Sequence, residues 1–179
     1  MTKAFWSICP PSPTLTTTGA FSLTMAAAFR CWPPAHARTN DDLSDLAYAH
    51  ATSAGRNTEM RDQGTAFGQL IAILTGVQPP ALPYPIAVGH AARSFELPTQ
   101  DVLAVFLQAL AAQLVSAAVR FVPLGTTDGQ KVLAALTPLI TTLAATCATE
   151  PLSALSSATF GADLAQMRHE TLDVRIFRS

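Results

Sequence analysis

Hydrophobic residues in this chain recur mostly at three- and four-residue spacing, which is typical of helices that bury one face. The first such segment follows Asn40, a favourable N-cap residue, and has two acidic residues in its first turn. It predicts a helix over residues 40–54, which Gly55 is expected to interrupt. The apolar spacing returns over residues 66–74, and Gly76 is the expected end of that second helix.

Two longer apolar segments, residues 102–119 and 132–149, contain no charged residue. The first predicts a helix over about residues 98–122, because a proline suits the first turn of a helix. The second predicts a helix that starts at Thr127 or Asp128. Shorter helices are expected over residues 86–95 and 163–170, and the proline-rich segment 77–85 predicts a loop. Since no alternating strand pattern occurs before the C-terminal tail, the chain is expected to form a single-domain, all-α helical bundle.

The first 39 residues differ from this pattern. They contain two pairs of adjacent prolines and a run of threonines, and only Ala20–Phe29 has the composition of a short helix. We therefore expect an atypical, disordered leader over residues 1–39, followed by the helical domain over residues 40–179.

The composition limits the kinds of partner that this chain is expected to bind. Charged residues make up 13% of the chain, about half the usual share, so its surface is expected to need a partner or an oligomer to cover apolar area. The net charge of −1 argues against binding to nucleic acid or to an anionic membrane surface. Cys9, Cys31 and Cys147 are widely spaced and form no CxxC, so they predict neither a disulfide framework nor a metal site, and favour a reducing, cytoplasmic location.

The two uncharged segments leave a membrane-associated helical hairpin as an alternative, because about 18 apolar residues suffice to span a bilayer. Gln108 and Gln113 interrupt the first segment. The second is diluted by Pro138, which is expected to kink the helix, and by threonines, among them Thr137, Thr141, Thr142 and Thr146. Neither end has an aromatic belt or a strong excess of positive charge. We therefore favour a bundle without membrane contact.

The sequence offers little for catalysis. Residues 125–131 have the spacing GxxxGxK, whereas a phosphate-binding P-loop requires GxxxxGK and a preceding strand. A phosphate-binding enzyme that uses Arg120 and Lys131 is kept as a further hypothesis, beside the helical bundle and the membrane-associated hairpin. The four histidines are scattered, and His50 is expected to be a core residue on an apolar helix face. His169 and Glu170 are adjacent, so they point in different directions and do not form an acid–base pair easily.

Two long motifs nevertheless resemble those of one family. LVSAAVRFVPLG at 114–125, followed by TDGQ at 127–130, is similar to the central signature of the urease accessory protein UreF family. MRHET at 167–171, followed by RIFRS at 175–179, resembles the C-terminus of that family. Residues 58–61, together with Gly68, are similar to a helix that precedes the central signature in that family. The resemblance covers roughly residues 40–179, with the two motifs in the same order.

This resemblance implies an all-α protein that is not itself an enzyme and holds no cofactor. It implies a cytoplasmic scaffold and regulator of the UreG GTPase, which acts in nickel incorporation into urease. The implied partners are UreD (also called UreH), UreG, the urease apoprotein and a second copy of the chain.

The resemblance also implies two groups of functional residues. The tail, in which arginines surround Ile176 and Phe177, is expected to dock UreD/UreH, since Phe and Arg are favoured interface anchors. The implied docking residues are Met167, Arg168, His169, Glu170, Arg175, Phe177, Arg178 and Ser179. The residues expected to face the dimer partner or UreG are Arg120, Pro123, Leu124, Gly125, Asp128, Gln130, Glu59 and Arg61.

The chain departs from the family pattern at several positions. The family usually has Gln where Thr126 stands and Ser where Gly64 stands, and it has polar and aromatic residues near Leu172 and Asp173. At the front, residues 19–22 resemble the start of the family motif but the following residues do not continue it. The helices expected before Asn40 are therefore missing, which points to a truncated or frameshifted gene product.

Overall fold

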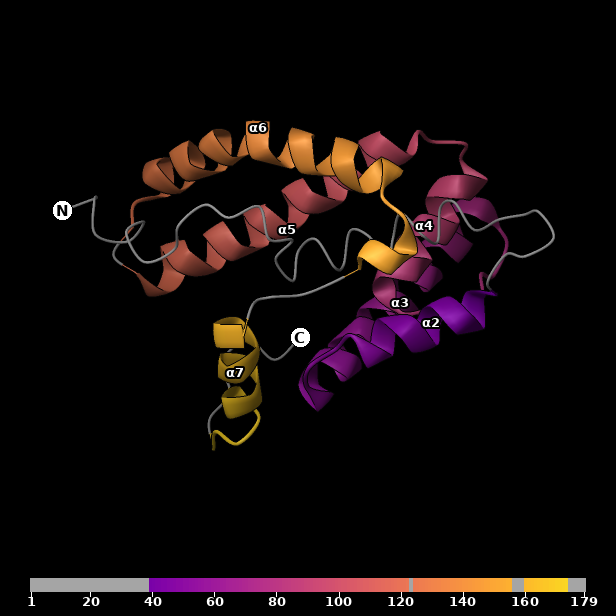
Figure 1. Ribbon diagram of the computed structural model, residues 1–179, viewed down its shortest axis with the longest axis horizontal. Helices are drawn as coiled ribbons and strands as arrows, with labels where there is room; N and C mark the ends of the chain where they lie inside the picture. The colour runs from indigo at the N-terminus through magenta and orange to yellow at the C-terminus, as the bar shows by residue number, and fades with distance from the viewer. Residues whose placement is uncertain (1–38, 123, 156–159, 174–179) are drawn as a thin grey trace.

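The computed structural model describes residues 39–122, 124–155 and 160–173, and within these ranges every regular element is helical (Figure 1). This confirms the all-α prediction. The elements are α2 (Asn40–Ala49), α3 (Ala54–Thr75), α4 (Tyr84–Ser94), α5 (Thr99–Phe121), α6 (Thr126–Thr149), the short 3₁₀ helix η1 (Leu152–Ala154) and α7 (Phe160–His169). The expected leader falls almost wholly on residues 1–38, which lie outside the described residues.

Helix α2 begins at Asn40, and its N-cap is Thr39 and not the predicted Asn40. The Thr39 hydroxyl accepts a hydrogen bond from the backbone N–H of Asp42, and the Asp42 carboxylate accepts one from the N–H of Thr39 (2.8 Å). Such a reciprocal capping box satisfies two N–H groups that the helix itself leaves without a partner. The helix ends at His50, which is exposed, so the prediction that His50 is a core residue was wrong.

The break between α2 and α3 lies at residues 50–53. The predicted interruption at Gly55 is therefore wrong. Ser53 is the N-cap of α3, with its hydroxyl accepting a hydrogen bond from the backbone N–H of Arg56 (3.1 Å). Gly55 therefore lies in the first turn of α3. The predicted end at Gly76 is confirmed, since Gly76 adopts a left-handed conformation with φ of 71°.

Helix α3 packs closely against the loop that leads into α4. A Cβ atom on Gly64 would overlap the backbone carbonyl oxygen of Leu82 and lie 2.9 Å from the backbone nitrogen of Tyr84. The absence of a side chain at Gly64 thus sets the distance between α3 and this loop. The Tyr84 ring lies between two aromatic neighbours, with ring centroids 5.8 Å from Phe67 and 5.8 Å from Phe106.

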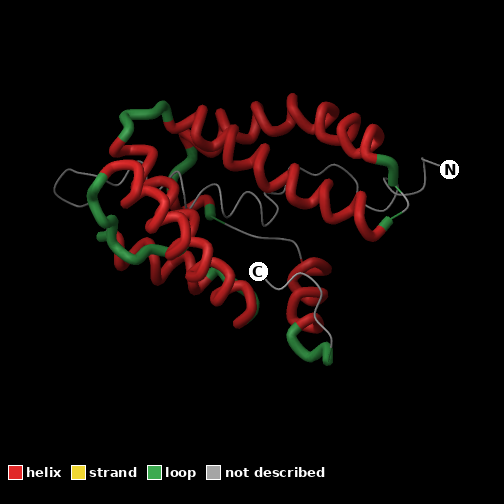
Figure 2. Tube along the Cα trace, turned by 180° about the vertical axis from the view of Figure 1, so that it is seen from behind, coloured by secondary structure: helices red, strands yellow, loops and turns green. Residues whose placement is uncertain are grey.

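Helices α5 and α6 form a long antiparallel pair (Figures 1 and 2). Gly129 lets them approach each other, because a Cβ atom there would lie 2.8 Å from Val119 Cγ2 and 3.1 Å from Val115 Cγ1. Helix α6 starts at Thr126 with Gly125 as N-cap, slightly before the predicted Thr127 or Asp128, and continues as one helix through Pro138. Threonine hydroxyls along α6 donate hydrogen bonds to carbonyls one turn earlier, so their methyl groups remain for contact with neighbours.

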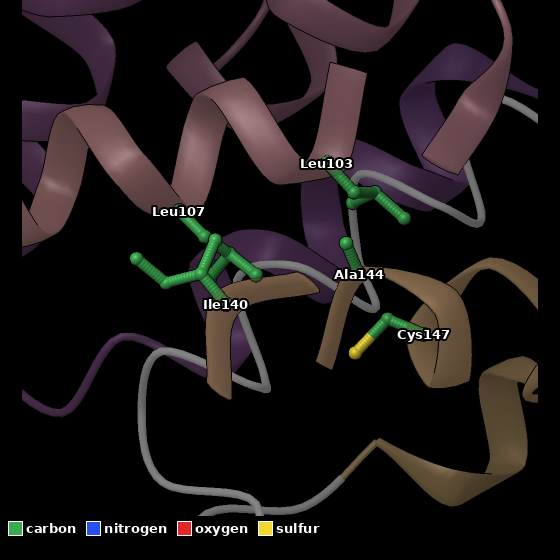
Figure 3. Packing of buried hydrophobic residues seen from close by; sticks show 5 residues of the cluster. All are labelled: Leu103, Leu107, Ile140, Ala144 and Cys147. Atoms are coloured by element: carbon green, nitrogen blue, oxygen red, sulfur yellow. The ribbon is translucent and has the colours of Figure 1, made fainter. Parts of the chain in front are cut away.

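Two clusters of buried residues hold these elements together. One lies between α5 and α6 and consists of Leu103, Leu107, Ile140, Ala144 and Cys147 (Figure 3). The other joins α2, α4 and the loop before α4, and consists of Leu43, Ala47, Leu82, Ile86 and Ala87. The segment around η1 connects them, because Leu152 packs on the second cluster and Leu155 on the first.

Candidate functional site

The described part of the chain shows neither a metal-binding group nor an enclosed catalytic cleft. No three His, Cys, Asp or Glu side chains among the described residues gather in a group that would hold a metal ion. A depression on α2 is open to solvent, and it is lined by Asp42, Asp45, Leu46 and Ala49. These residues provide two carboxylates but no histidine, cysteine, serine or lysine beside them.

The segment that was compared with a phosphate loop is the start of a helix. Gly125 is the N-cap of α6, and the following residues form its first turns. Lys131 Nζ lies 2.9 Å from Asp128 Oδ1, so the lysine is paired with a carboxylate of its own helix. A carboxylate at this position disfavours a phosphate anion, and this geometry gives the phosphate-binding hypothesis no support.

The turn between α5 and α6 lies at the end of this helix pair that points away from α2, α3 and α4 (Figure 1). Arg120 lies in the last turn of α5 and is exposed, and Asp128 lies in the first turn of α6. Between them, Phe121 and Val122 expose 58% and 56% of their surface. Gly125 and Gln130 are exposed, Leu124 is half-buried, and Pro123 lies outside the described residues. The turn thus combines two opposite charges with uncovered apolar side chains.

Glu59 and Arg61, which were grouped with this turn, lie on α3 at a different place in the molecule (Figures 1 and 2). Glu59 is half-buried and pairs with Arg56 (3.3 Å), and it accepts a hydrogen bond from Gln63 (3.1 Å). Arg61 is exposed and lies 3.7 Å from Asp62. The fold therefore places these two residues and the hairpin turn on separate surfaces.

Helix α7 holds the described residues of the expected docking tail. Met167 and Arg168 are exposed, whereas His169 and Glu170 are half-buried. Leu164 is exposed on the same side as Met167, one turn earlier, and Leu172 is exposed just after the helix. Sequence reasoning missed Leu164, although its i, i+3 spacing to Met167 is the signal that would have identified it. Arg175, Phe177, Arg178 and Ser179 lie outside the described residues.

Polar side chains of α7, and that of Glu170 just after it, contact the junction of α2 and α3. Glu170 Oε1 accepts a hydrogen bond from the backbone N–H of Gly55 (2.6 Å). The Thr52 hydroxyl lies 3.2 Å from Asp163 Oδ1 and donates a hydrogen bond to it. In both views, α7 lies apart from the α5–α6 pair, next to the start of α3 (Figures 1 and 2).

Large apolar side chains are also exposed in two other places. Near its end α3 exposes Leu70, Ile73 and Leu74, of which Ile73 and Leu74 lie three and four residues after Leu70, on one helix face, and Val77 is exposed just after the helix. Helices α5 and α6 are each long and apolar enough to cross a membrane by length and composition alone, a test that core helices of soluble proteins also pass. Only 22% of the apolar window of α5 and 17% of that of α6 is buried, so the described chain leaves most of this pair uncovered.

Comparison with known proteins points to one family. The model of the UreF family matches residues 16–137 of this chain. The chain is 55% identical to a urease accessory protein UreF from Cereibacter sphaeroides (strain ATCC 17029 / ATH 2.4.9), over 148 residues that are 81% of this chain and 70% of that relative. It is 49% identical to the protein of that name from Paracoccus denitrificans (strain Pd 1222), over 138 residues that are 77% of this chain and 64% of that relative. A third relative of that name, from Dinoroseobacter shibae (strain DSM 16493 / NCIMB 14021 / DFL 12), is 46% identical over 78% of this chain and 66% of the relative.

Proposed function

The chain belongs to the UreF family of urease accessory proteins, and we propose that it acts in urease maturation as a cytoplasmic scaffold that regulates the UreG GTPase during nickel incorporation. Family membership implies that it interacts with other urease accessory proteins. The observation that carries the proposal is the match to UreF relatives, joined to a described surface that is poor in charge and rich in uncovered apolar side chains. Such a surface is typical of a protein that works through its partners.

The proposed partner on one side is UreD/UreH, bound by α7 and the tail. Exposed Leu164, Met167 and Arg168 supply apolar and basic contacts, and the tail residues Arg175, Phe177, Arg178 and Ser179 extend them along the sequence. Aromatic residues, Met and Arg are the residue types that protein interfaces enrich. The surface on α7 is therefore suited to a partner with a mixed apolar and acidic groove.

The proposed occupant of the hairpin turn is a second copy of this chain. Arg120 and Asp128 carry opposite charges at the same turn, so a two-fold arrangement places Arg120 of one copy near Asp128 of the other. Phe121 and Val122 would become buried between them. UreG is the other occupant that the family resemblance allows here, and a change in UreG binding without a change in oligomeric state would favour it.

Co-purification tests the tail assignment. The chain is co-expressed with the UreD/UreH and UreG proteins of the same organism, and captured complexes are analysed. Deletion of residues 175–179 is expected to abolish capture of UreD/UreH, while the exposed control variant Asp45→Ala retains it. Full capture by the deletion variant would remove the tail from the proposal.

Urease activation tests the function itself. Cells that carry the urease structural genes and the other accessory genes should gain nickel-dependent urease activity when this chain is added. The rate of GTP hydrolysis by UreG, measured with and without the chain in the presence of UreD/UreH, should change. Equal urease activity and equal GTP hydrolysis with and without the chain would refute the scaffold and regulator roles.

A further inference from the structure

Helix α7 turns polar side chains toward the rest of the chain. Asp163, Gln166 and Glu170 follow one another at three- and four-residue spacing, so they lie on one side of the helix. Glu170 and Asp163 hydrogen-bond to the α2–α3 junction, and a Cβ atom on Gly55 would lie 3.7 Å from Gln166 Nε2. The apolar side chains of Leu164 and Met167 stay 47% and 44% exposed.

The start of α3 is a favourable place to hold this polar face. The first N–H groups of a helix have no partner within the helix, and the helix dipole favours negative charge there. The Ser53 hydroxyl accepts from the N–H of Arg56, and the Glu170 carboxylate accepts from the N–H of Gly55. The first turn of α3 contains no acidic residue, so Glu170 supplies this charge from a helix more than a hundred residues later in the chain.

Gly55 provides the room that this contact needs. A Cβ atom at Gly55 would lie 3.3 Å from Glu170 Oε1 and 3.8 Å from Glu170 Cγ, so a larger residue would press on the carboxylate. The second contact, from Thr52 to Asp163, lies almost two turns earlier along α7. Two contacts separated along the helix axis fix the direction of α7, whereas one contact would leave it free to pivot.

We propose that Asp163 and Glu170 form a latch that docks α7 on the start of α3, and that Glu170 is the positioning residue which sets where the partner-binding face and the tail emerge. This inference rests on the proposed binding of UreD/UreH by α7 and the tail. It gives three residues of the MRHE segment two different roles. Met167 and Arg168 face the partner, and Glu170 contacts the chain itself and acts through the position of α7.

Hydrogen exchange of the Gly55 amide tests the latch directly, because an N–H in the first turn of a helix has no other intrahelical protection. In ¹⁵N-labelled full-length protein, the Gly55 amide should exchange slowly. Glu170→Ala removes the acceptor and should speed its exchange by about tenfold or more, since hydrogen bonds to charged groups are among the stronger ones. Glu170→Gln keeps an acceptor oxygen and should give an intermediate rate. Asp45→Ala is the control and should leave the rate unchanged.

Partner binding supplies the second readout. Glu170→Ala should weaken UreD/UreH binding several-fold, and Glu170→Gln should restore part of the loss. If Gly55 exchange is the same in Glu170→Ala and in the parent protein, the latch is wrong even where deletion of residues 175–179 abolishes binding. If that deletion leaves binding intact while Gly55 exchange responds as expected, the latch stands and the proposed docking role of the tail fails. Unchanged partner binding in Glu170→Ala, together with faster Gly55 exchange, overturns the positioning role.

Discussion

Individual glycines in this chain differ in what they do, although they look alike in the sequence. Gly64 is packed against the backbone of the loop before α4, whereas Gly68, one turn later on α3, has only an ordinary contact of 3.5 Å from its would-be Cβ to Pro79 Cγ. A serine at Gly64, which the family resemblance leads us to expect, would require this loop to move. The two positions therefore make a matched pair.

Gly64→Ala is expected to lower the free energy of unfolding by about 3 kcal/mol, because backbone atoms on the loop cannot give way as a flexible side chain can. Gly68→Ala should instead leave stability unchanged or raise it by about 0.5–1 kcal/mol, since alanine is the better helix former. Urea unfolding followed by circular dichroism measures both. Equal effects at the two positions would show that α3 and the loop are not in close contact.

Tyr84 gives stability a dependence on alkaline pH. Burial raises the pKa of the Tyr84 phenol above its usual value of 10.0. Below pH 10 the phenol is protonated in the folded and the unfolded chain, and its contribution is complete. Above pH 10 the unfolded chain loses this proton first, so the free energy of unfolding falls as pH rises through the folded-state pKa.

Urea unfolding between about pH 8 and pH 11 measures this decline. Tyr84→Phe should reduce it while leaving the aromatic contacts with Phe67 and Phe106 in place. The same substitution at Tyr48, the other tyrosine of the chain, is the control and should leave the decline as it is. An identical pH profile in the parent protein and Tyr84→Phe would contradict the assignment.

At the scale of elements, the α5–α6 pair depends on close approach at its turn. Gly129→Ala places a methyl group against Val115 and Val119, and should lower the free energy of unfolding by about 1–2 kcal/mol. Gly161 on α7 meets nothing within 4 Å of its would-be Cβ, so Gly161→Ala is the matched control and should be neutral or slightly stabilising. Thermal unfolding of both variants checks the difference. Equal melting temperatures would show that α5 and α6 do not touch at Gly129.

Helix existence was predictable from the sequence because three- and four-residue spacing reports burial directly, as Leu103 and Leu107 illustrate. Helix boundaries were less predictable from the sequence. The start of α2 depends on the cap at Thr39 and the start of α3 on the hydroxyl of Ser53, and neither residue changes the apolar pattern. The orientation of α7 could not be predicted either, because local residue spacing does not show which side of a helix packs against the rest of the chain. A long-range contact such as Glu170 to Gly55 leaves no local signal in the sequence.

At the scale of the whole molecule, the family motifs could be identified in the sequence. Which of their residues share a surface could not be predicted from it. The sequence named Glu59 and Arg61 together with the hairpin-turn residues as facing the dimer partner or UreG, and could not show whether they share a surface. The fold separates them, since α3 packs on α4 while the turn lies at the free end of α5 and α6 (Figure 1). Surfaces of this kind depend on how helices are arranged in space, which residue spacing does not contain.

The proposed dimer makes a prediction about charge that involves the whole molecule. Arg120→Asp places like charges against Asp128 of the second copy and should shift the protein toward the monomer. The double variant Arg120→Asp, Asp128→Arg restores opposite charges across a two-fold axis and should recover the dimer. Lys131→Ala removes the ion pair within one chain (2.9 Å) without changing the proposed contact, so this variant should remain dimeric.

Sedimentation equilibrium measures the association constants of the parent protein and of these variants. A double variant that stays as monomeric as Arg120→Asp would exclude this pairing, and dimers of equal strength in all variants would place the second copy on another surface, of which the uncovered end of α3 is the next to test.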